Sequence, residues 1–253
     1  MPMPYLFATQ DEDYSDYASG RVIYNLPGLP AFPVRLANEI FLRALERFGR
    51  RNLSNQRLTL YDPTCGGAYH LTALGLLHGQ AIGAILASDI AERAVMVARR
   101  NLGLLSAQGL DLREQEIRAM LEQFGKESHA GALESLQVLR ERVQTVPPIR
   151  ARVFRANALD VQALEKELSG ETIHLVISDI PYGQLSAWQV PEGTGSSQSP
   201  LWRMLAALHR VLSPGAVVAI AADKSQKIEH EMYHRVERFQ VGKRRVSLLE
   251  PVG

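Results

Sequence analysis

The chain has 253 residues, of which 46% are hydrophobic and 22% are charged, and its formal net charge is +1. These totals are typical of a soluble globular protein with one large α/β domain or two small ones, and they exclude a strong overall attraction to nucleic acid. The single cysteine, Cys65, excludes an intramolecular disulfide and favours a reducing cytoplasm.

The sequence also argues against a secreted or membrane protein and against a metal-binding protein. The N-terminus lacks a basic segment followed by an apolar one, and no apolar run is long enough to cross a membrane, so we expect a cytoplasmic protein without a membrane partner. The seven histidines show no pair at metal-ligand spacing, so no metal site is expected.

The predicted elements alternate between helices and strands along most of the chain. In chain order they are a helix at 34–48, a strand with a glycine turn at 58–67, a helix at 69–79, a strand at 81–90, a helix at 92–105, strands at 150–157 and 172–180, a strand at 216–223 after a turn at 213–215, and a hairpin at 235–250. This alternation predicts a Rossmann-like α/β fold with a mostly parallel, seven-stranded sheet, helices on both faces and a C-terminal antiparallel hairpin.

Two segments stand outside the alternation within a chain that we expect to form a single domain, residues 1–253. Residues 1–57 form an N-terminal extension and helix, of which residues 1–20 are expected to be loose or to order late. Residues 104–150 form a helical insertion with charges of both signs. This insertion is either a helical pair that covers one sheet edge or an arm that helps to grip a large substrate.

The predicted strands end in polar or glycine-rich turns. In an open parallel sheet, ligands bind beyond the carboxyl ends of the strands. The first strand runs into Asp-Pro-Thr-Cys-Gly-Gly at 62–67, where the glycines allow close approach of a ligand and the next helix offers unpaired N–H groups. Such a turn also occurs for packing alone, so both interpretations remain open.

The next two strands end in Asp89 and Asn157. A carboxylate at Asp89 can accept hydrogen bonds from both ribose hydroxyls, or it can cap the helix that begins at Glu92. Asn157 can accept from an adenine amino group, or it can be an ordinary turn residue. Both positions therefore favour a nucleotide ligand only when they are taken together.

The first turn argues against a dinucleotide. It begins with Asp62 and lacks the G-x-G-x-x-G pattern, and a carboxylate there would repel a pyrophosphate but suit an ammonium group. A ligand with adenosine at one end and an amino acid at the other is S-adenosylmethionine, which we predict as the cofactor.

At this point the sequence resembles the class I S-adenosylmethionine-dependent methyltransferases, over roughly residues 25–250. The matching motifs are Asp-Pro-Thr-Cys-Gly-Gly at 62–67, the acid Asp89 and its neighbour Ile90, Ala-Asn-Ala at 156–158, and Asp-Ile-Pro-Tyr at 179–182. The resemblance implies that the cofactor is bound by Asp62, Thr64, Cys65, Gly66, Gly67, Asp89, Ile90, Asn157, Ala158 and Asp179. Three positions depart from the family pattern: Ala68 replaces a glycine, Asn157 replaces an aspartate, and Ile180 replaces a proline.

The order of the motifs is most similar to guanine-specific RNA methyltransferases, and over the whole chain to the avilamycin-resistance 23S rRNA guanine methyltransferases. The resemblance implies an enzyme that methylates a guanine base in 23S rRNA or the large ribosomal subunit and confers resistance to an antibiotic such as avilamycin. We expect this enzyme to be a monomer. Alternatives are methylation of a DNA adenine or a protein amide, and a non-catalytic nucleotide-binding Rossmann protein. No separate RNA-binding module is visible, so the N-terminus and the insertion would have to help hold RNA.

The motif at 179–182 supplies the predicted catalytic residues Asp179, Pro181 and Tyr182. Asp179 and the carbonyl beside Pro181 can accept hydrogen bonds from a base amine and orient its nitrogen, while Tyr182 can stack on a base removed from its helix. Trp188 either gates this pocket or packs on the sheet edge.

Two basic clusters are possible phosphate contacts. The first comprises Arg35, Arg43, Arg47, Arg50 and Arg51, and the second comprises Lys243, Arg244 and Arg245. The second cluster can equally protect a hairpin edge from pairing with another strand.

Overall fold

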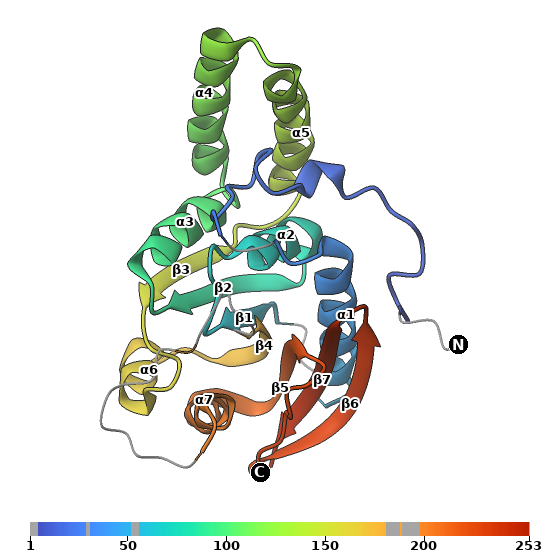
Figure 1. The fold of residues 1–253 in the computed structure, drawn as a ribbon, viewed down its shortest axis with the longest axis vertical. Coiled ribbons are helices and arrows are strands. Elements are labelled where there is room, and N and C mark those ends of the chain that lie inside the picture. The colour runs from blue at the N-terminus through green and yellow to red at the C-terminus, as the bar shows by residue number, and fades with distance from the viewer. Residues whose placement is uncertain (1–4, 29–30, 52–55, 181–187, 189–197, 253) are drawn as a thin grey trace.

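One seven-stranded sheet organises the molecule (Figure 1), with the strand order β3-β2-β1-β4-β5-β7-β6. The structure is a computed structural model that describes residues 5–28, 31–51, 56–180, 188 and 198–252. Its strands are β1 (Leu58–Asp62), β2 (Ile82–Asp89), β3 (Arg150–Arg155), β4 (Ile173–Asp179), β5 (Leu212–Asp223), β6 (Tyr233–Val241) and β7 (Arg244–Pro251). Its helices are η1 (Ser15–Tyr17), α1 (Val34–Arg51), α2 (Tyr69–His78), α3 (Glu92–Gly103), α4 (Ala107–Phe124), α5 (Glu127–Gln144), α6 (Val161–Glu167) and α7 (Pro200–His209).

The predicted fold class is confirmed by the strand pairing. Strands β1 to β5 pair parallel with one another, and β7 pairs antiparallel with both β5 and β6 at one edge. From β1 the chain builds outward to β2 and β3, and then crosses to the other side for β4 and β5. The strand order therefore reverses between β1 and β4, which is where an open α/β sheet binds its ligand.

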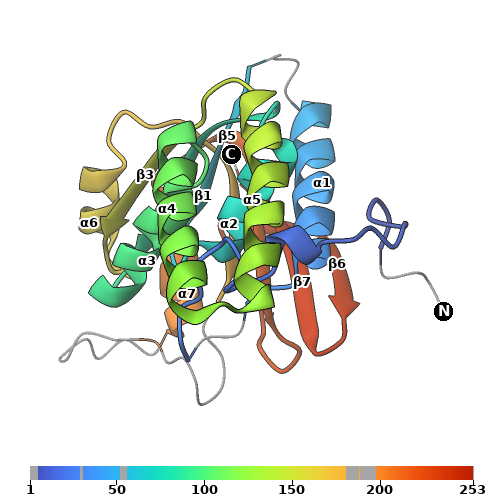
Figure 2. The ribbon, with the colours of Figure 1, turned by 90° about the horizontal axis from the view of Figure 1, so that it is seen from above.

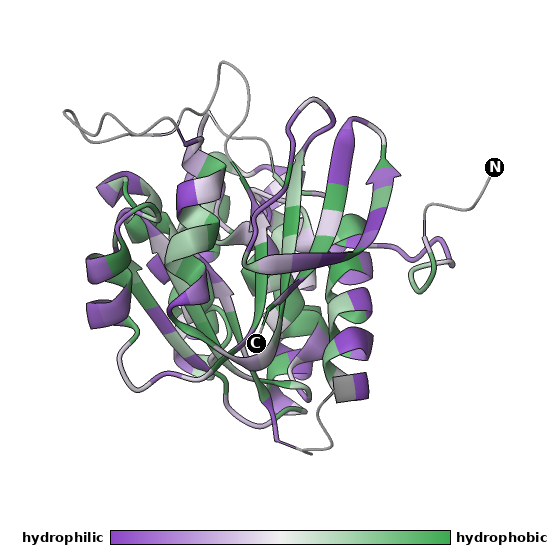
Figure 3. Ribbon diagram, turned by 90° about the horizontal axis from the view of Figure 1, so that it is seen from below, coloured by the Kyte–Doolittle hydropathy of each residue, from purple (hydrophilic) through white to green (hydrophobic). Residues whose placement is uncertain are grey.

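Alternate residues of the buried strands face two separate apolar layers. Leu60 of β1 packs in the layer that contains α1, α2 and α3, whereas its neighbour Tyr61 packs in the layer that contains α6 and α7. Strands buried on both faces need nearly continuous apolar sequence, as β1 and β4 have. Figure 3 shows the hydrophobic strands between helices whose outer surfaces are more hydrophilic.

The last parallel strand begins earlier than predicted. Residues 213–215 were expected to form a turn, but β5 starts at Leu212, and its register against β4 shifts between Ile173 and Leu175. The early residues of β5 form an irregularity in its pairing with β4. Gly215 lies in this irregularity with a φ of +76°, a conformation that would strain a residue with a side chain. Helices α6 and α7 were also missed, although Asp160 and Ser199 cap their first turns.

The N-terminal segment is not loose in its described part, from Tyr5 onward. Glu39 of α1 is fully buried and accepts hydrogen bonds from the backbone N–H groups of Leu6, Phe7 and Ala8 at 2.6, 2.9 and 2.7 Å. Its other partner is Arg43, whose Nε lies 2.6 Å from the carboxylate. The prediction of a loose segment was wrong because it ignored a buried acid, which requires donors from somewhere in the chain.

The helical insertion forms an antiparallel pair, α4 and α5, that projects beyond the two layers (Figures 1 and 2). Ser106 caps α4, and Gly125, with a φ of +60°, ends it and allows the chain to reverse. The base of the pair packs on α2, α3 and η1. The expectation that it covers a sheet edge is therefore wrong, and its role as a substrate-gripping arm stays a prediction.

Among the described residues, no helix combines the length and apolar character that crossing a bilayer requires. In the same part of the chain, no cluster of histidine, cysteine and acidic side chains is arranged to hold a metal ion.

Candidate active site

A cavity of about 550 Å³ opens at the carboxyl ends of the central strands. It is lined by almost all the residues predicted to bind the cofactor: Thr64, Cys65, Gly66, Gly67, Asp89, Ile90, Asn157, Ala158 and Asp179. Trp188 lines it too. The predicted catalytic residues Pro181 and Tyr182 lie outside the described residues.

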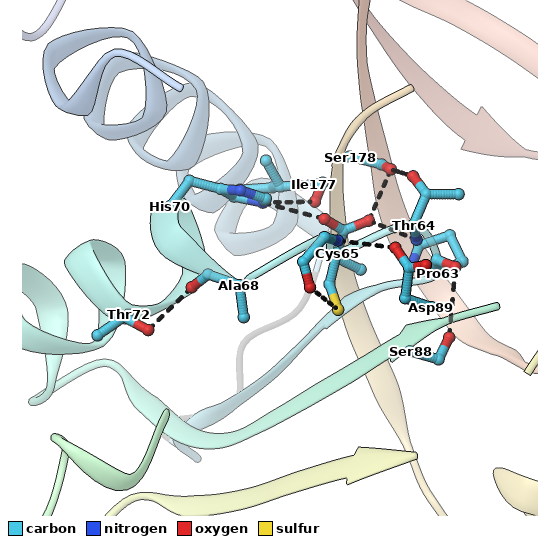
Figure 4. A network of polar contacts seen from close by, with 12 residues as sticks. Pro63, Thr64, Cys65, Ala68, His70, Thr72, Ser88, Asp89, Ile177 and Ser178 are labelled. Carbon is cyan, nitrogen blue, oxygen red and sulfur yellow. Dashed lines mark hydrogen bonds and ion pairs between the residues drawn. The ribbon is translucent and has the colours of Figure 1, made fainter. Parts of the chain in front are cut away.

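Asp62 is the one predicted cofactor residue that does not line this cavity. Its side chain is fully buried beneath the first turn, where Oδ1 accepts hydrogen bonds from Ser178 Oγ at 2.6 Å and from the Thr64 N–H at 2.9 Å. Figure 4 labels Thr64 and Ser178. The expected direct contact between Asp62 and an ammonium group is therefore not what this geometry offers. Its carboxylate instead contacts residues of the turn and of β4.

One of these residues is Thr64, which does line the cavity. The Ser178 hydroxyl donates to the Asp62 carboxylate, so it cannot also donate to Thr64, whose Oγ1 lies 2.7 Å away. Thr64 must then donate to Ser178, which leaves the lone pairs of its own oxygen as acceptors. The buried charge of Asp62 thus determines the direction in which the Thr64 hydroxyl at the cavity wall donates its hydrogen bond.

His70 lies on the other side of Asp62. Its Nε2 is 3.2 Å from Asp62 Oδ2 and 3.3 Å from the Ile177 carbonyl oxygen, and since both neighbours are acceptors, Nε2 carries the proton. Burial acts to lower the pKa of His70, but the hydrogen bond and charge of Asp62 outweigh it and raise that pKa above its ordinary value. The sequence offered no signal for this pair.

Asp89 ties two turns together at the end of β2. One carboxylate oxygen accepts from the Gly66 N–H at 2.9 Å, and the other accepts from the Ala91 N–H at 2.9 Å. It does not cap α3, whose N-cap is Ala91 without a side-chain cap bond. Burial raises the pKa of Asp89, and the charge of Asp62 adds to this, while the backbone donors oppose it. The carboxylate remains in the cavity wall, as the ribose hypothesis requires.

The first turn is shaped by backbone conformations that favour glycine. Gly66 has a φ of +53°, and a Cβ on Gly67 would meet Val97 Cγ1 at 3.1 Å and Leu26 Cβ at 3.3 Å. Ala68 also has a φ of +53°, a left-handed conformation that costs a non-glycine residue about 1–2 kcal/mol. Its methyl group is fully buried in the core and does not line the cavity. The methyl group that Ala68 carries in place of a glycine hydrogen therefore does not reach the cavity.

Sequence reasoning missed the wall opposite the strands, which comes from the N-terminal extension. Residues 24–28 and 31–32 line the cavity, and Asn101 of α3 holds them in place. This fully buried amide accepts from the Tyr24 N–H at 2.7 Å and donates to the carbonyls of Tyr24 at 3.0 Å and Gly67 at 2.8 Å. The sequence offered only one signal of this wall, which was the asparagine Asn101 within the otherwise amphipathic helix α3.

Tyr24 connects this wall to the projecting helical pair. Its ring lies between two guanidinium groups, with Arg100 at 3.9 Å and Arg113 at 4.2 Å from its centroid, and its hydroxyl donates to Glu116 at 2.8 Å. The base of α4 therefore contacts a cavity-lining residue directly.

At the end of β4, Asp179 is only about one-fifth exposed. Its Oδ1 is buried and has no hydrogen-bond partner among the described residues, while Oδ2 lies 3.5 Å from Arg244 Nη2. Burial raises the pKa of Asp179, and the charge of Arg244 partly offsets that rise. Since neighbouring parallel strands lie about 4.8 Å apart and β1 separates β2 from β4, Asp179 and Asp89 stand on the order of 10 Å from each other across the cavity.

Asn157 has a local role as well as a place in the cavity. Its Oδ1 accepts from the Leu159 N–H at 3.0 Å, which fixes the turn after β3. Its predicted contact with adenine stays a prediction.

The arginines of α1 are engaged within the protein, which weakens their interpretation as phosphate contacts. Arg35 binds Asp11 and the carbonyls of Ala8 and Thr9, Arg43 binds Glu39 and Glu237, Arg47 binds the Val236 carbonyl, and Arg50 binds Glu46. The side chain of Arg51 is outside the described part of the structure. This cluster ties α1 to the N-terminus and to β6.

Comparison with known proteins agrees with this geometry. Residues 3–244 match the family described as rRNA methyltransferase AviRa. The chain is 39% identical over 246 residues to the 23S rRNA (guanine(2535)-N(1))-methyltransferase of Streptomyces viridochromogenes, which covers 97% of this chain and 95% of that protein. Two solved structures of rRNA methyltransferase AviRa from the same organism have TM-scores of 0.84 and 0.85 at 38% and 37% identity, over 97% of this chain and 96% of each. The chain therefore belongs to the AviRa family of rRNA methyltransferases.

Proposed function

We propose that this enzyme transfers a methyl group from S-adenosylmethionine to N1 of a guanine base in 23S rRNA. The observation that carries the proposal is the buried Oδ1 of Asp179, an acceptor at the cavity without a partner among the described residues. A guanine presents N–H donors at N1 and N2, which such an acceptor suits. The name of the Streptomyces relative supports the choice of RNA, base and atom.

The residues of the cavity fit the cofactor. Its volume of about 550 Å³ lies within the roughly 300–1,000 Å³ of ligand pockets. Each carboxylate oxygen of Asp89 accepts one backbone N–H and has a second lone pair, so the two oxygens can still accept from two ribose hydroxyls. Asn157 and Ala158 border the space beyond Asp89, where an adenine would lie.

The amino-acid end of the cofactor would meet Thr64. Its oxygen is an acceptor because Asp62 and Ser178 orient its hydroxyl, and the Asp62 carboxylate beneath adds negative charge. A positively charged ammonium group suits this wall, whereas a pyrophosphate does not.

When bound, S-adenosylmethionine supplies a methyl group on a positively charged sulfur, which keeps the electron pair of the broken bond. The protein must make guanine N1 able to accept that methyl group. N1 carries a proton and its lone pair is delocalised, so the proton has to leave. Asp179 Oδ1 is the acceptor for the N1–H, and the carboxylate takes that proton as the N1 electron pair becomes available.

The environment of Asp179 suits a general base, that is, a group that accepts a proton during the reaction. Burial raises its pKa, which brings the carboxylate closer in basicity to the group that it must deprotonate. A negative charge on Asp179 at neutral pH is still favoured by Arg244, 3.5 Å away.

We further propose that the enzyme acts as a cytoplasmic monomer and that the methyl group confers resistance to a ribosome-targeting antibiotic such as avilamycin. The expected stacking of Tyr182 on the target base remains part of the proposal.

The test is incorporation of a radiolabelled methyl group from S-adenosylmethionine into 23S rRNA, 16S rRNA, DNA and protein, followed by primer-extension mapping. We expect a single guanine of 23S rRNA to be labelled, and the label to be lost with Asp179→Ala. Labelling of DNA adenine or of a protein amide would overturn the proposal. Host cells that express the wild type, and not Asp179→Ala, should survive avilamycin.

A further inference from the structure

Arg244 occupies an unusual place for a hairpin residue. It is the first residue of β7 and pairs with Asp223 at the end of β5. Because β7 runs antiparallel to β5, its first residue lies at the sheet edge where the parallel strands end, which is the edge that holds the cavity. Antiparallel pairing therefore brings a C-terminal cation to the active site.

The contacts of Arg244 point toward the substrate end of that cavity. Its Nη2 lies 3.5 Å from Asp179 Oδ2, and its guanidinium carbon lies 5.1 Å from the ring centroid of Phe32, a cavity-lining residue. The side chains of Arg244 and Asp179 are only 20% and 21% exposed. A guanidinium carries five donors, so a group that contacts Asp179 can also bind an acceptor on a ligand.

We propose that Arg244 and Asp179 together recognise the Watson–Crick edge of the target guanine, with Arg244 donating to O6 and Asp179 accepting from N1–H. This inference rests on the proposed function and adds to it a residue that selects the base. On guanine the acceptor O6 lies beside the donors N1–H and N2–H, which matches an arginine beside a carboxylate. On adenine the order is reversed, so the N6 amine would face Arg244 and the N1 lone pair would face Asp179.

The same placement assists the proton transfer. When the N1–H bond breaks, the proton passes to the Asp179 carboxylate, and the bond's electron pair stays on the ring and forms the new N1–CH₃ bond. Until that bond forms, negative charge is shared between N1 and O6. A cation at O6 stabilises this charge, so Arg244 contributes to the reaction as well as to selection.

The first experiment measures binding without the cofactor. Short 23S rRNA fragments carry either guanine or 2-aminopurine, which lacks O6, at the mapped target position. We expect the wild type to prefer guanine, and Arg244→Gln to lose roughly 10-fold to 100-fold of that preference, the discrimination typical of one arginine–guanine contact. 2-Aminopurine also lacks the N1 proton. The wild type and Arg244→Gln both lose the contact with this proton, so its effect cancels when their preferences are compared.

Two variants serve as controls. Arg245→Gln removes the same charge from the next residue of β7, whose side chain points to the other face of the sheet, and it should keep the wild-type preference. Arg244→Lys keeps the charge but loses the planar fork, and it should show an intermediate preference. Calorimetry with S-adenosylmethionine confirms that each variant is folded. An undiminished guanine preference in folded Arg244→Gln or Arg244→Lys would overturn the inference.

The second experiment is the pH dependence of single-turnover methyl transfer. Burial raises the pKa of Asp179 most strongly; Arg244 on β7 and His70 on α2 lower that pKa, and Asp62 on β1 raises it. Removing Arg244 should raise that pKa, so the acid limb of the rate profile should move to higher pH in Arg244→Gln and not in Arg245→Gln. An unmoved limb would contradict a role for Arg244 beside the reacting group.

These results separate the two claims. A wild type that methylates no guanine in 23S rRNA would refute the proposed function. A wild type that methylates guanine, with a preference that survives Arg244→Gln, would refute this inference alone.

Discussion

The two ends of the cavity differ in how far their polar groups are already engaged. At the first end, the turns after β1 and β2 are already held by hydrogen bonds: Asp89 accepts from two backbone N–H groups, and Asp62 accepts from Thr64 and Ser178. At the second end, Asp179 keeps a buried oxygen without a partner among the described residues, beside Arg244. We call these the cofactor end and the base end.

This difference follows from what each end has to do. A cofactor that binds in one fixed pose is best met by groups already locked in position, because little conformational entropy is then lost on binding. A base that enters only for the reaction is best met by hydrogen-bonding capacity that the protein alone does not satisfy, because that capacity is used with the substrate in place. Variants at the two ends should therefore fail in different ways.

The largest effect is expected at the base end, from Asp179→Ala. Removal of one preorganised group typically costs about 10²–10³ in rate, so methyl transfer should fall by that factor while the Kd of S-adenosylmethionine changes little. Single-turnover kinetics and calorimetry measure the two quantities. Asp223→Ala, which removes the acid at the end of β5 outside the cavity, should leave both unchanged. Undiminished methyl transfer by Asp179→Ala would show that Asp179 has no part in the reaction.

At the cofactor end, Asp89→Ala should produce the opposite pattern. Two hydrogen bonds to a charged acceptor predict a loss of about 2–4 kcal/mol in cofactor binding, visible as a weaker Kd in calorimetry. The matched control is Asp160→Ala, which removes a helix-capping acid after β3. It should cost about 1 kcal/mol of stability without changing the Kd. Equal affinity for the cofactor in wild type and folded Asp89→Ala would remove Asp89 from the cofactor end.

The buried pair of Asp62 and His70, below the cofactor end, should contribute a smaller, pH-dependent effect on the free energy of unfolding. Asp62→Asn should lower the free energy of unfolding by about 1–3 kcal/mol, because buried hydrogen bonds to a charge are lost. The pKa of His70 is raised in the folded protein, so the stability from its pairing with Asp62 is fully present below the unfolded value of 6.5 and is lost as the pH rises through the raised value. Urea unfolding at several pH values should show the wild-type advantage shrinking at alkaline pH; a constant advantage would contradict the assignment.

The smallest expected effect lies outside both ends, on α1. Arg50 binds Glu46 within the same helix, so Arg50→Gln should leave the salt dependence of RNA binding unchanged. Each lost phosphate contact would lower the slope of log K against log salt by roughly 0.7–0.9 units. A flatter slope would restore these arginines as an RNA-binding surface.

Much of this arrangement was predictable because it depends on local pattern. Apolar runs that end in Asp62, Asp89 and Asp179 are enough to place three acids at one sheet edge, since parallel strands share that edge. The family resemblance then implied a set of cofactor residues, all of which line the cavity except Asp62. Helical periodicity likewise gave the boundaries of α1, α2 and α3 to within a few residues.

What could not be predicted depends on contacts between distant segments. Nothing in the sequence near Glu39 indicates that it binds the backbone of residues 6–8, or that Asn101 holds the wall near Tyr24. The arginines of α1 resembled a phosphate site because their partners, such as Glu237, lie almost two hundred positions away in the chain. Arg244 was interpreted as either a phosphate contact or a hairpin-edge charge, because its position beside Asp179 follows only from the pairing of β7 with β5.

The chemical identity of the product tests the central claim most directly. After incubation of 23S rRNA with the wild type and S-adenosylmethionine, the RNA is digested to nucleosides and analysed by mass spectrometry. We predict 1-methylguanosine, because Asp179 is placed to accept the N1–H of a guanine whose O6 meets Arg244. The appearance of N2-methylguanosine or a methylated adenosine instead would contradict this account of the base end.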